Sequence, residues 1–245
     1  MNGSDEGQLL GTRSAYDTMS SVTAAAHELK APLALLRQLA LRLEDETLSS
    51  SERQRLVEHM TLTSERALRL TSDLTKSARL EDALFDLEPL NPEQVCRDIA
   101  VELAPLFSAH QRELRVEHRS HPLLLVANRD LLRRIVMNFS DNALHYSQPG
   151  TAVRIQIQAL KKSGMIRVGV RDFGPALSSD MWRTLQKKLS KAPQAIHARP
   201  QSSGLGLFIA SQFADAMHGH IGVTRHRDGA TFYVELQASQ QLSLL

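Results

Sequence analysis

The chain has 245 residues, of which 42% are hydrophobic and 23% charged, a composition typical of one or two globular domains. Its formal net charge of +2, from 29 basic and 27 acidic residues, argues against a protein whose main task is to coat nucleic acid. The single cysteine, Cys96, excludes an internal disulfide and a metal site built on several cysteines. No apolar run approaches the ~20 residues of a membrane helix and no signal peptide is visible. We therefore expect a cytoplasmic chain without a membrane segment, either a separate protein or the cytoplasmic part of a longer membrane protein.

The charge is divided unevenly along the chain. Residues 1–88 carry 10 basic and 15 acidic side chains, whereas residues 89–245 carry 19 basic and 12 acidic ones. Two surfaces of opposite sign favour two domains with different partners.

The first part of the chain predicts two helices with the spacing of a coiled coil. After a polar segment, residues 1–14, which we expect to be flexible, apolar residues recur at intervals of four and three from Val22 to Leu43. A second run with the same alternation extends from Leu56 to Leu74. Such seams are built to pack against other helices.

A short polar stretch, residues 45–51, separates the two runs and predicts a helical hairpin. Within and just after it, Ser49 and Glu52 have the spacing of a capping box at the start of the second helix. Since a lone hairpin has too little core, we expect residues 15–86 to dimerise into a four-helix bundle. An intramolecular coiled-coil linker is the alternative that periodicity alone leaves open.

From about Leu87 the pattern changes to strands and helices in mixed blocks. This mixture predicts an α+β sandwich over residues 87–245, with a sheet covered on one face by helices. We expect helices over residues 93–110, 130–145 and 205–217, and strands over residues 114–118, 123–126, 152–159, 165–171, 221–225 and 230–236.

A histidine and a glutamate stand side by side in the first helix. His27 falls beside the apolar seam, so its ring is expected to face solvent, and Pro32 should bend the helix close to it. If Glu28 reaches the imidazole Nδ1, it fixes the tautomer and leaves Nε2 as a nucleophile. Taken alone, such a pair is more often part of a solvated helix face.

The predicted helix over residues 130–145 carries a polar stripe opposite its apolar stripe. Asn138, Asp141, Asn142 and His145 follow one another at helical spacing. Asparagine is a poor helix former, and two asparagines one turn apart can bring oxygen ligands to one magnesium ion. A hydrated helix face is the simpler explanation if this stripe is considered alone.

Two turns that contain glycine follow. The first, residues 172–175, ends a predicted strand with Asp172, whose carboxylate can accept a hydrogen bond from an exocyclic amine such as that of adenine. The second, residues 202–207, precedes a helix, where glycines let backbone amides approach phosphates. Each signal is weak by itself, and the second turn lacks the lysine of a Walker-type loop.

The order and separation of these four features resemble those of sensor histidine kinases of two-component systems. Residues 27–33 resemble the phosphoacceptor box of that family, residues 138–147 its N box, and residues 172–175 and 203–207 its two glycine boxes. The resemblance covers nearly the whole chain. It implies a dimerisation and histidine-phosphotransfer hairpin followed by an ATP-binding sandwich of the Bergerat (GHKL) type.

The resemblance also implies a reaction and its partners. In this family the γ-phosphoryl group of ATP passes to the histidine and then to an aspartate in the receiver domain of a response regulator. His27 would be the phosphoacceptor and Glu28 its general base, in a homodimer formed through the hairpin. ATP and Mg²⁺ are the implied cofactors, and no nucleic acid is expected as a partner.

The resemblance assigns roles in nucleotide binding as well. Asn142 would hold Mg²⁺ with Asn138 in its outer shell, and Asp172 would bind the adenine amine. Tyr146 would pack near the base. The remaining nucleotide-binding positions that it implies are His145, Gly174, Gly204, Leu205 and Gly206.

In the nucleotide-binding part, three positions depart from the family pattern. Ala176 and Ser202 stand where glycines are usual, and His145 stands where a lysine or arginine often lies near the phosphates. These departures favour a first alternative, a phosphotransfer or docking module with a weakened ATP site. A second alternative is a Bergerat-fold ATPase or kinase that acts on another target, which the pairing of His27 with Glu28 argues against.

Overall fold

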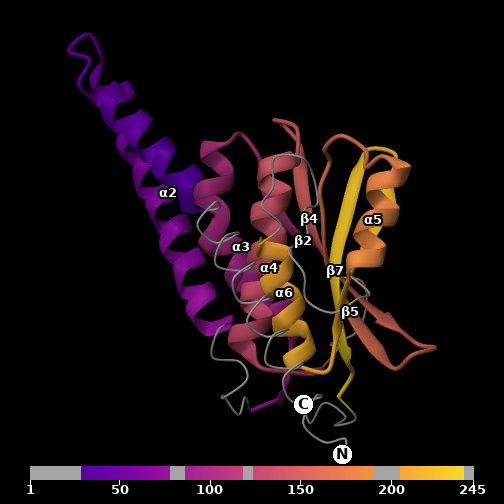
Figure 1. Cartoon of the computed structure of the whole chain (residues 1–245). Coiled ribbons are helices and arrows are strands. Elements are labelled where there is room, and N and C mark those ends of the chain that lie inside the picture. Colours follow the sequence, from indigo (N-terminus) through magenta and orange to yellow (C-terminus); the bar gives the residue numbers. More distant parts are fainter. Residues whose placement is uncertain (1–28, 78–85, 118–123, 190–204, 240–245) are drawn as a thin grey trace, which may run out of the picture.

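The computed structural model describes residues 29–77, 86–117, 124–189 and 205–239. It has two parts, a pair of long helices and an α+β sandwich that packs beside them (Figure 1). The predicted fold class is confirmed for the sandwich, whereas only part of the predicted hairpin lies within the described residues. No helix in the described ranges is long and apolar enough to cross a membrane.

The helical pair is joined by a turn whose polar groups bind one another. Residues 29–43 are helical, and α2 (Ser50–Ser77) follows. The predicted capping box is confirmed, because the Ser49 amide donates to Glu52 Oε2 at 2.9 Å and the Glu52 amide donates to Ser49 Oγ at 3.3 Å. The Ser49 hydroxyl and amide hold the pKa of Glu52 below its usual value. These bonds fix the point at which the chain reverses.

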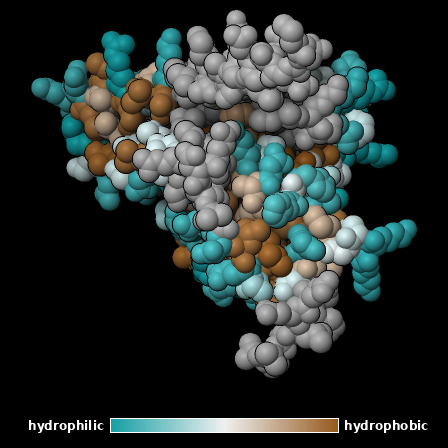
Figure 2. Space-filling model, turned by 60° about the horizontal axis from the view of Figure 1, so that its bottom comes forward, coloured by the Kyte–Doolittle hydropathy of each residue, from teal (hydrophilic) through white to brown (hydrophobic). Residues whose placement is uncertain are grey.

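The surface of the helical pair keeps apolar side chains exposed. Leu39 and Leu56 are buried, whereas Leu33 and Leu68 are 58% and 68% exposed. Figure 2 shows hydrophobic side chains gathered on the left of the view, over this pair of helices. Large apolar side chains left exposed on a helix indicate a surface that can bind another protein segment.

A five-stranded sheet forms one layer of the sandwich. Its spatial order is β2-β4-β5-β7-β6, with β2 and β4 parallel and all other neighbours antiparallel. The strands are β2 (Glu113–Glu117), β4 (Ala152–Leu160), β5 (Met165–Arg171), β6 (His220–His226) and β7 (Gly229–Gln237). A separate antiparallel pair joins β1 (Glu88–Leu90) to β3 (Leu125–Ala127).

Three helices cover one face of this sheet (Figure 1). They are α3 (Pro92–Ala109), α4 (Arg129–Tyr146) and α6 (Leu205–Ala216). A fourth helix, α5 (Ser179–Leu189), packs at the β6 edge. The core lies between helices and sheet, and its largest fully buried side chains include Phe107, Phe139 and Phe213.

Most predicted elements of the sandwich agree with the structure to within about two residues, but two elements were missed. β1 has only three residues and contains Pro89, so it carries no strand periodicity. The pattern of α5 contains few apolar residues, and Leu185 is its only fully buried side chain within the described part of that helix. Both elements are stabilised by tertiary contacts more than by local pattern.

Replacing Phe213 with alanine should destabilise the sandwich by about 3–5 kcal/mol, because it removes a fully buried aromatic side chain and leaves a cavity. The single tryptophan, Trp182, lies in α5, so its fluorescence during urea unfolding reports this part of the chain. Val101→Ala is the control, since Val101 is 76% exposed on α3. Equal decreases in the free energy of unfolding of Phe213→Ala and Val101→Ala would contradict this account of the core.

Candidate functional site

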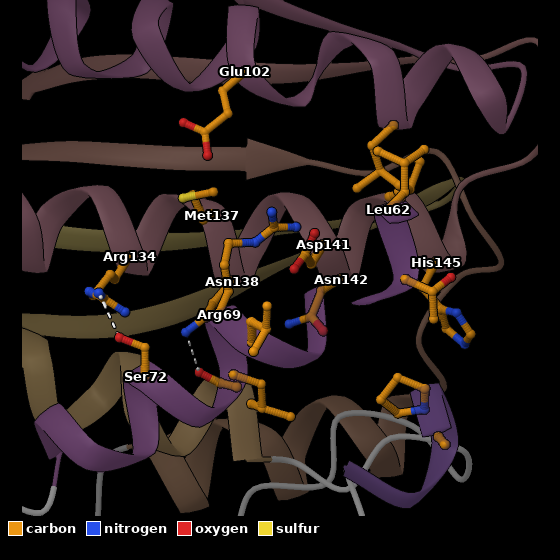
Figure 3. Close-up of a pocket in the computed structure, with 18 of the residues that line it drawn as sticks. Leu62, Arg69, Ser72, Glu102, Arg134, Met137, Asn138, Asp141, Asn142 and His145 are labelled. Carbon is orange, nitrogen blue, oxygen red and sulfur yellow. Dashed lines mark hydrogen bonds between the residues drawn. The ribbon is translucent and has the colours of Figure 1, made fainter. Parts of the chain in front are cut away.

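A cavity of about 710 Å³ lies between the helical pair and the polar face of α4. Residues from both helices of the pair form one wall, and residues of α3, α4 and the start of α6 form the other. Figure 3 shows polar side chains of α4 and α2 that meet across this space. The cavity therefore depends on both parts of the molecule.

Helix α4 presents its polar stripe to the cavity because its other face is buried. Ile135, Val136 and Phe139 are at most 1% exposed against the sheet. The buried Ser140 hydroxyl donates to the Val136 carbonyl at 2.8 Å and so satisfies its hydrogen bond within the helix. At the start of the helix, Asn128 Oδ1 accepts from two backbone amides at 3.1 Å each. The N-terminal cap and the buried apolar face together fix the orientation of α4 about its own axis.

The structure brings together five of the predicted site residues at the cavity wall. Asn138, Asn142, His145 and Tyr146 come from α4 and Gly206 from α6. Figure 3 shows Asn138, Asn142 and His145 on this wall. Asn138 Nδ2 donates to the Gly206 carbonyl at 3.4 Å and joins the two helices. The rings of His145 and Tyr146 meet edge to face with centroids 4.8 Å apart. Asp141, part of the predicted polar stripe, lines the same wall.

Asp172 lies at the end of β5 and is not among the residues that line the cavity. Its side chain is 1% exposed, and Oδ1 accepts from the Gly174 amide at 3.1 Å and from the Ala230 amide at 3.2 Å. Its own amide donates to the Ala230 carbonyl at 2.9 Å. A buried carboxylate held by backbone amides has a fixed orientation, which suits recognition of a hydrogen-bond donor.

Ser147 connects the Asp172 segment to the end of α4. It is buried, and its hydroxyl oxygen accepts from the Phe173 amide at 3.2 Å. The Gln148 amide donates to the Phe173 carbonyl at 3.2 Å, and Arg112 Nε donates to the Ser147 carbonyl at 2.9 Å. Through Ser147, the predicted residues on α4 and the segment that contains Asp172 and Gly174 are thus neighbours.

Three predicted site residues lie outside the described residues. These are His27 and Glu28 of the phosphoacceptor box and Gly204 of the second glycine box. Leu205 is the first residue of α6. The nearest described residues of the first helix, Ala31 and Pro32, line the cavity.

Sequence reasoning missed three arginines at the cavity. Arg134 Nη2 donates to Ser72 Oγ at 3.2 Å and joins α4 to α2, and burial lowers the pKa of this arginine (Figure 3). Arg133 forms an ion pair with Glu102. Arg69 of α2 has no hydrogen bond or ion pair with the described part of the chain. No local pattern signals these residues, because α2 and α4 meet only in three dimensions.

The donor set of the cavity suits a polyanion with a hard cation. Amide oxygens of Asn138 and Asn142 and the carboxylate of Asp141 are ligands of the kind that Mg²⁺ prefers. Across the described ranges, no three side chains of His, Cys, Asp or Glu gather as a complete metal site. Arginines complement the oxygen atoms of phosphate groups, and three arginines line the same cavity.

Comparison with known proteins agrees with this geometry. Residues 127–240 match the family model described as histidine kinase-, DNA gyrase B- and HSP90-like ATPase. The sensor protein GacS of Pseudomonas syringae pv. syringae is 32% identical over 158 residues, 63% of this chain and 17% of that protein. The swarming motility regulation sensor protein RssA of Serratia marcescens is 30% identical over 224 residues, 88% of this chain and 45% of that protein. The chain spans less than half the length of either relative.

Solved structures share the fold. Full-length ShkA in complex with AMPPNP has a TM-score of 0.61 at 24% identity, over 92% of this chain and 47% of that one. The histidine kinase ThkA in complex with the response regulator protein TrrA also has a TM-score of 0.61, at 17% identity, over 93% of this chain and 64% of that one.

Residues 127–240 are therefore similar to the ATPase domains of histidine kinases, DNA gyrase B and HSP90. Over most of its length, the chain is similar to sensor histidine kinases of two-component systems.

Replacing Ser147 with alanine should destabilise the sandwich by about 1–2 kcal/mol, since the Phe173 amide loses its acceptor in a buried setting. Hydrogen exchange at Phe173 and Gly174 should become faster in the same variant. Ser163→Ala is the matched control, because Ser163 is exposed in the turn between β4 and β5. Unchanged exchange at Phe173 would show that Ser147 does not hold this segment.

Proposed function

We propose that the chain is the core of an ATP-dependent protein-histidine kinase that autophosphorylates His27 and passes the phosphoryl group to an aspartate of a response regulator. The observation that carries the proposal is the polar stripe of α4, which belongs to the matched domain and faces the helical pair across the cavity. Residues 15–86 would be the phosphotransfer hairpin and residues 87–245 the catalytic domain.

The nucleotide would bind along the polar face of α4. Asn142 would contribute an oxygen ligand to Mg²⁺, with Asn138 in the outer shell, and the bound cation would offset negative charge on the phosphates. Asp172 would accept a hydrogen bond from the adenine amine, and Tyr146 would pack near the base. His145, Gly174, Gly204, Leu205 and Gly206 would complete the binding site.

The transfer step would use the first helix. His27 Nε2 would form a bond to the γ-phosphorus of ATP while the bond from that phosphorus to the β–γ bridging oxygen breaks, so that ADP leaves with the electron pair. Glu28 would accept the proton from Nδ1. The position of Ala31 and Pro32 on the cavity wall supports this placement, since they follow His27 by only four and five residues in the sequence.

The proposed partners are a second copy of the chain and the receiver domain of a response regulator. Exposed apolar side chains on the helical pair, including Leu41 and Val57 at 54% and 49% exposure, support pairing of two hairpins. The complex of ThkA with TrrA supports the second partner by analogy of fold.

Incubation with γ-labelled ATP and Mg²⁺ should give an acid-labile, alkali-stable phosphoryl group on the chain, and His27→Ala should abolish it. His59→Ala is the matched control, because His59 is another histidine of the helical pair and lines the same cavity. Label that survives His27→Ala would exclude His27 as the acceptor and indicate another target.

Nucleotide binding without any label would instead support a docking module with a weakened ATP site. The side chain at position 145 bears on that alternative, because a neutral imidazole stabilises transferring negative charge less than a fixed cation does.

Arg69→Gln should weaken ATP binding about tenfold and leave adenosine binding unchanged, since the guanidinium faces the same cavity as the polar stripe and would meet phosphate oxygens. Arg55→Gln removes the same charge from an exposed position of α2 and serves as the control. Titration calorimetry of each variant with ATP and with adenosine measures these affinities. Equal losses of ATP affinity in Arg69→Gln and Arg55→Gln would mean that Arg69 acts only through the overall positive charge of the protein and not through contact with the phosphates.

A further inference from the structure

An arginine with a buried side chain stands directly before Asp172. Arg171 ends β5, and its side chain is 9% exposed. Its Nη2 forms an ion pair with Asp228 Oδ1, and its Nη1 donates to the backbone carbonyl of Asp172. The guanidinium also lies over the ring of Phe173, 4.4 Å from its centroid. Removing a guanidinium from water is costly unless its donors are satisfied, and here both Nη1 and Nη2 have an acceptor.

The partner of this arginine belongs to the turn between β6 and β7. Gly229, next to Asp228, has φ +133°, and a Cβ there would lie 2.3 Å from the Asp172 carbonyl oxygen and 2.5 Å from Asp172 Oδ1. The turn therefore packs directly against Asp172. The following amide, that of Ala230, donates to Asp172 Oδ1.

Asp172 is thus held by the same turn in two ways. The amide of Ala230 binds its carboxylate, while Asp228 binds Arg171, which in turn binds the backbone carbonyl of Asp172. A displacement of the turn moves both anchors together. Because a hydrogen bond to a base loses strength steeply with misalignment, the orientation of the carboxylate controls how well it reads an exocyclic amine.

We propose that Arg171 and Asp228 form a positioning pair that sets the orientation of the Asp172 carboxylate and thereby the base selectivity of the nucleotide site. This inference rests on the proposed function, because it assumes that a purine nucleotide binds there. Neither residue touches the base. Both act through Asp172 and the turn.

The experiment compares ATP with ITP, which lacks the exocyclic amine at the same ring position. The measured quantity is the ratio of the Kd of ITP to the Kd of ATP, obtained by calorimetry on the full chain. Arg171→Met and Asp228→Asn should each lower this ratio at least fivefold. The double variant should lower it no further than the single variants, because the two residues act as one unit.

Arg167→Met is the matched control. Arg167 lies four residues earlier on β5, stacks on the Tyr233 ring at 3.8 Å and pairs with Glu235, so its removal costs similar packing and charge. It has no contact with Asp172, and the ratio should stay at the wild-type value. If Arg171 had a purely structural role, Arg171→Met and Arg167→Met would both lower the stability of the fold, and the ratio of the two Kd values would stay unchanged in both.

The outcomes separate the inference from the proposed function. A wild-type chain that does not bind ATP overturns the proposed function. A wild-type chain that binds ATP and ITP equally overturns both the reading of the adenine amine by Asp172 and the positioning pair. An Arg171→Met variant that keeps the wild-type ratio overturns the positioning pair alone. If Arg171→Met does not fold, Asp228→Asn decides, since the Asp228 side chain is 66% exposed and its replacement leaves the core intact.

Discussion

The burial of one face of α4 is the constraint on which the candidate site depends. Ile135 and Phe139 have almost no exposed surface, so the helix cannot rotate without removing them from the core. Its polar stripe must then face the cavity. Asn138 and Ser147 extend the same constraint outward, because one binds the carbonyl of Gly206 and the other binds the amide of Phe173. The site is positioned by packing first and by hydrogen bonds second.

The sequence allowed prediction of what is local in this arrangement. A helical period places Asn138 and Asn142 on one face whatever the rest of the chain does, and the end of a strand places Asp172 at a sheet edge. The hydrogen bond from the Ala230 amide joins residues 58 positions apart, and no periodicity encodes it. The contact of Arg134 with Ser72, 62 positions apart, was unpredictable for the same reason.

The predicted seam of the first helix illustrates a different limit. Leu33 belongs to the seam and is 58% exposed, while Leu39 lies outside it and is 5% exposed. Heptad spacing identifies the apolar residues that lie on one face of a helix, but it does not show which of them become buried within a single chain. In the described helices Leu39 and Leu56 are buried while Leu33 and Leu68 stay exposed, and such exposed apolar side chains agree with the proposed pairing of two hairpins.

The helical pair contacts the sandwich through the packing of Leu62 and Leu70 against its core, the edge-to-face contact of the His59 and His110 rings, and the hydrogen bond from Arg134 to Ser72. That hydrogen bond contributes about 1 kcal/mol, whereas each fully buried phenylalanine of the sandwich contributes several times as much. The alignment of α4 and of Asp172 therefore depends mainly on the core of the sandwich. Under the proposed function, the site would bind a nucleotide and the modified hairpin would then meet a partner. Binding groups aligned by the sandwich core would keep their positions through both steps.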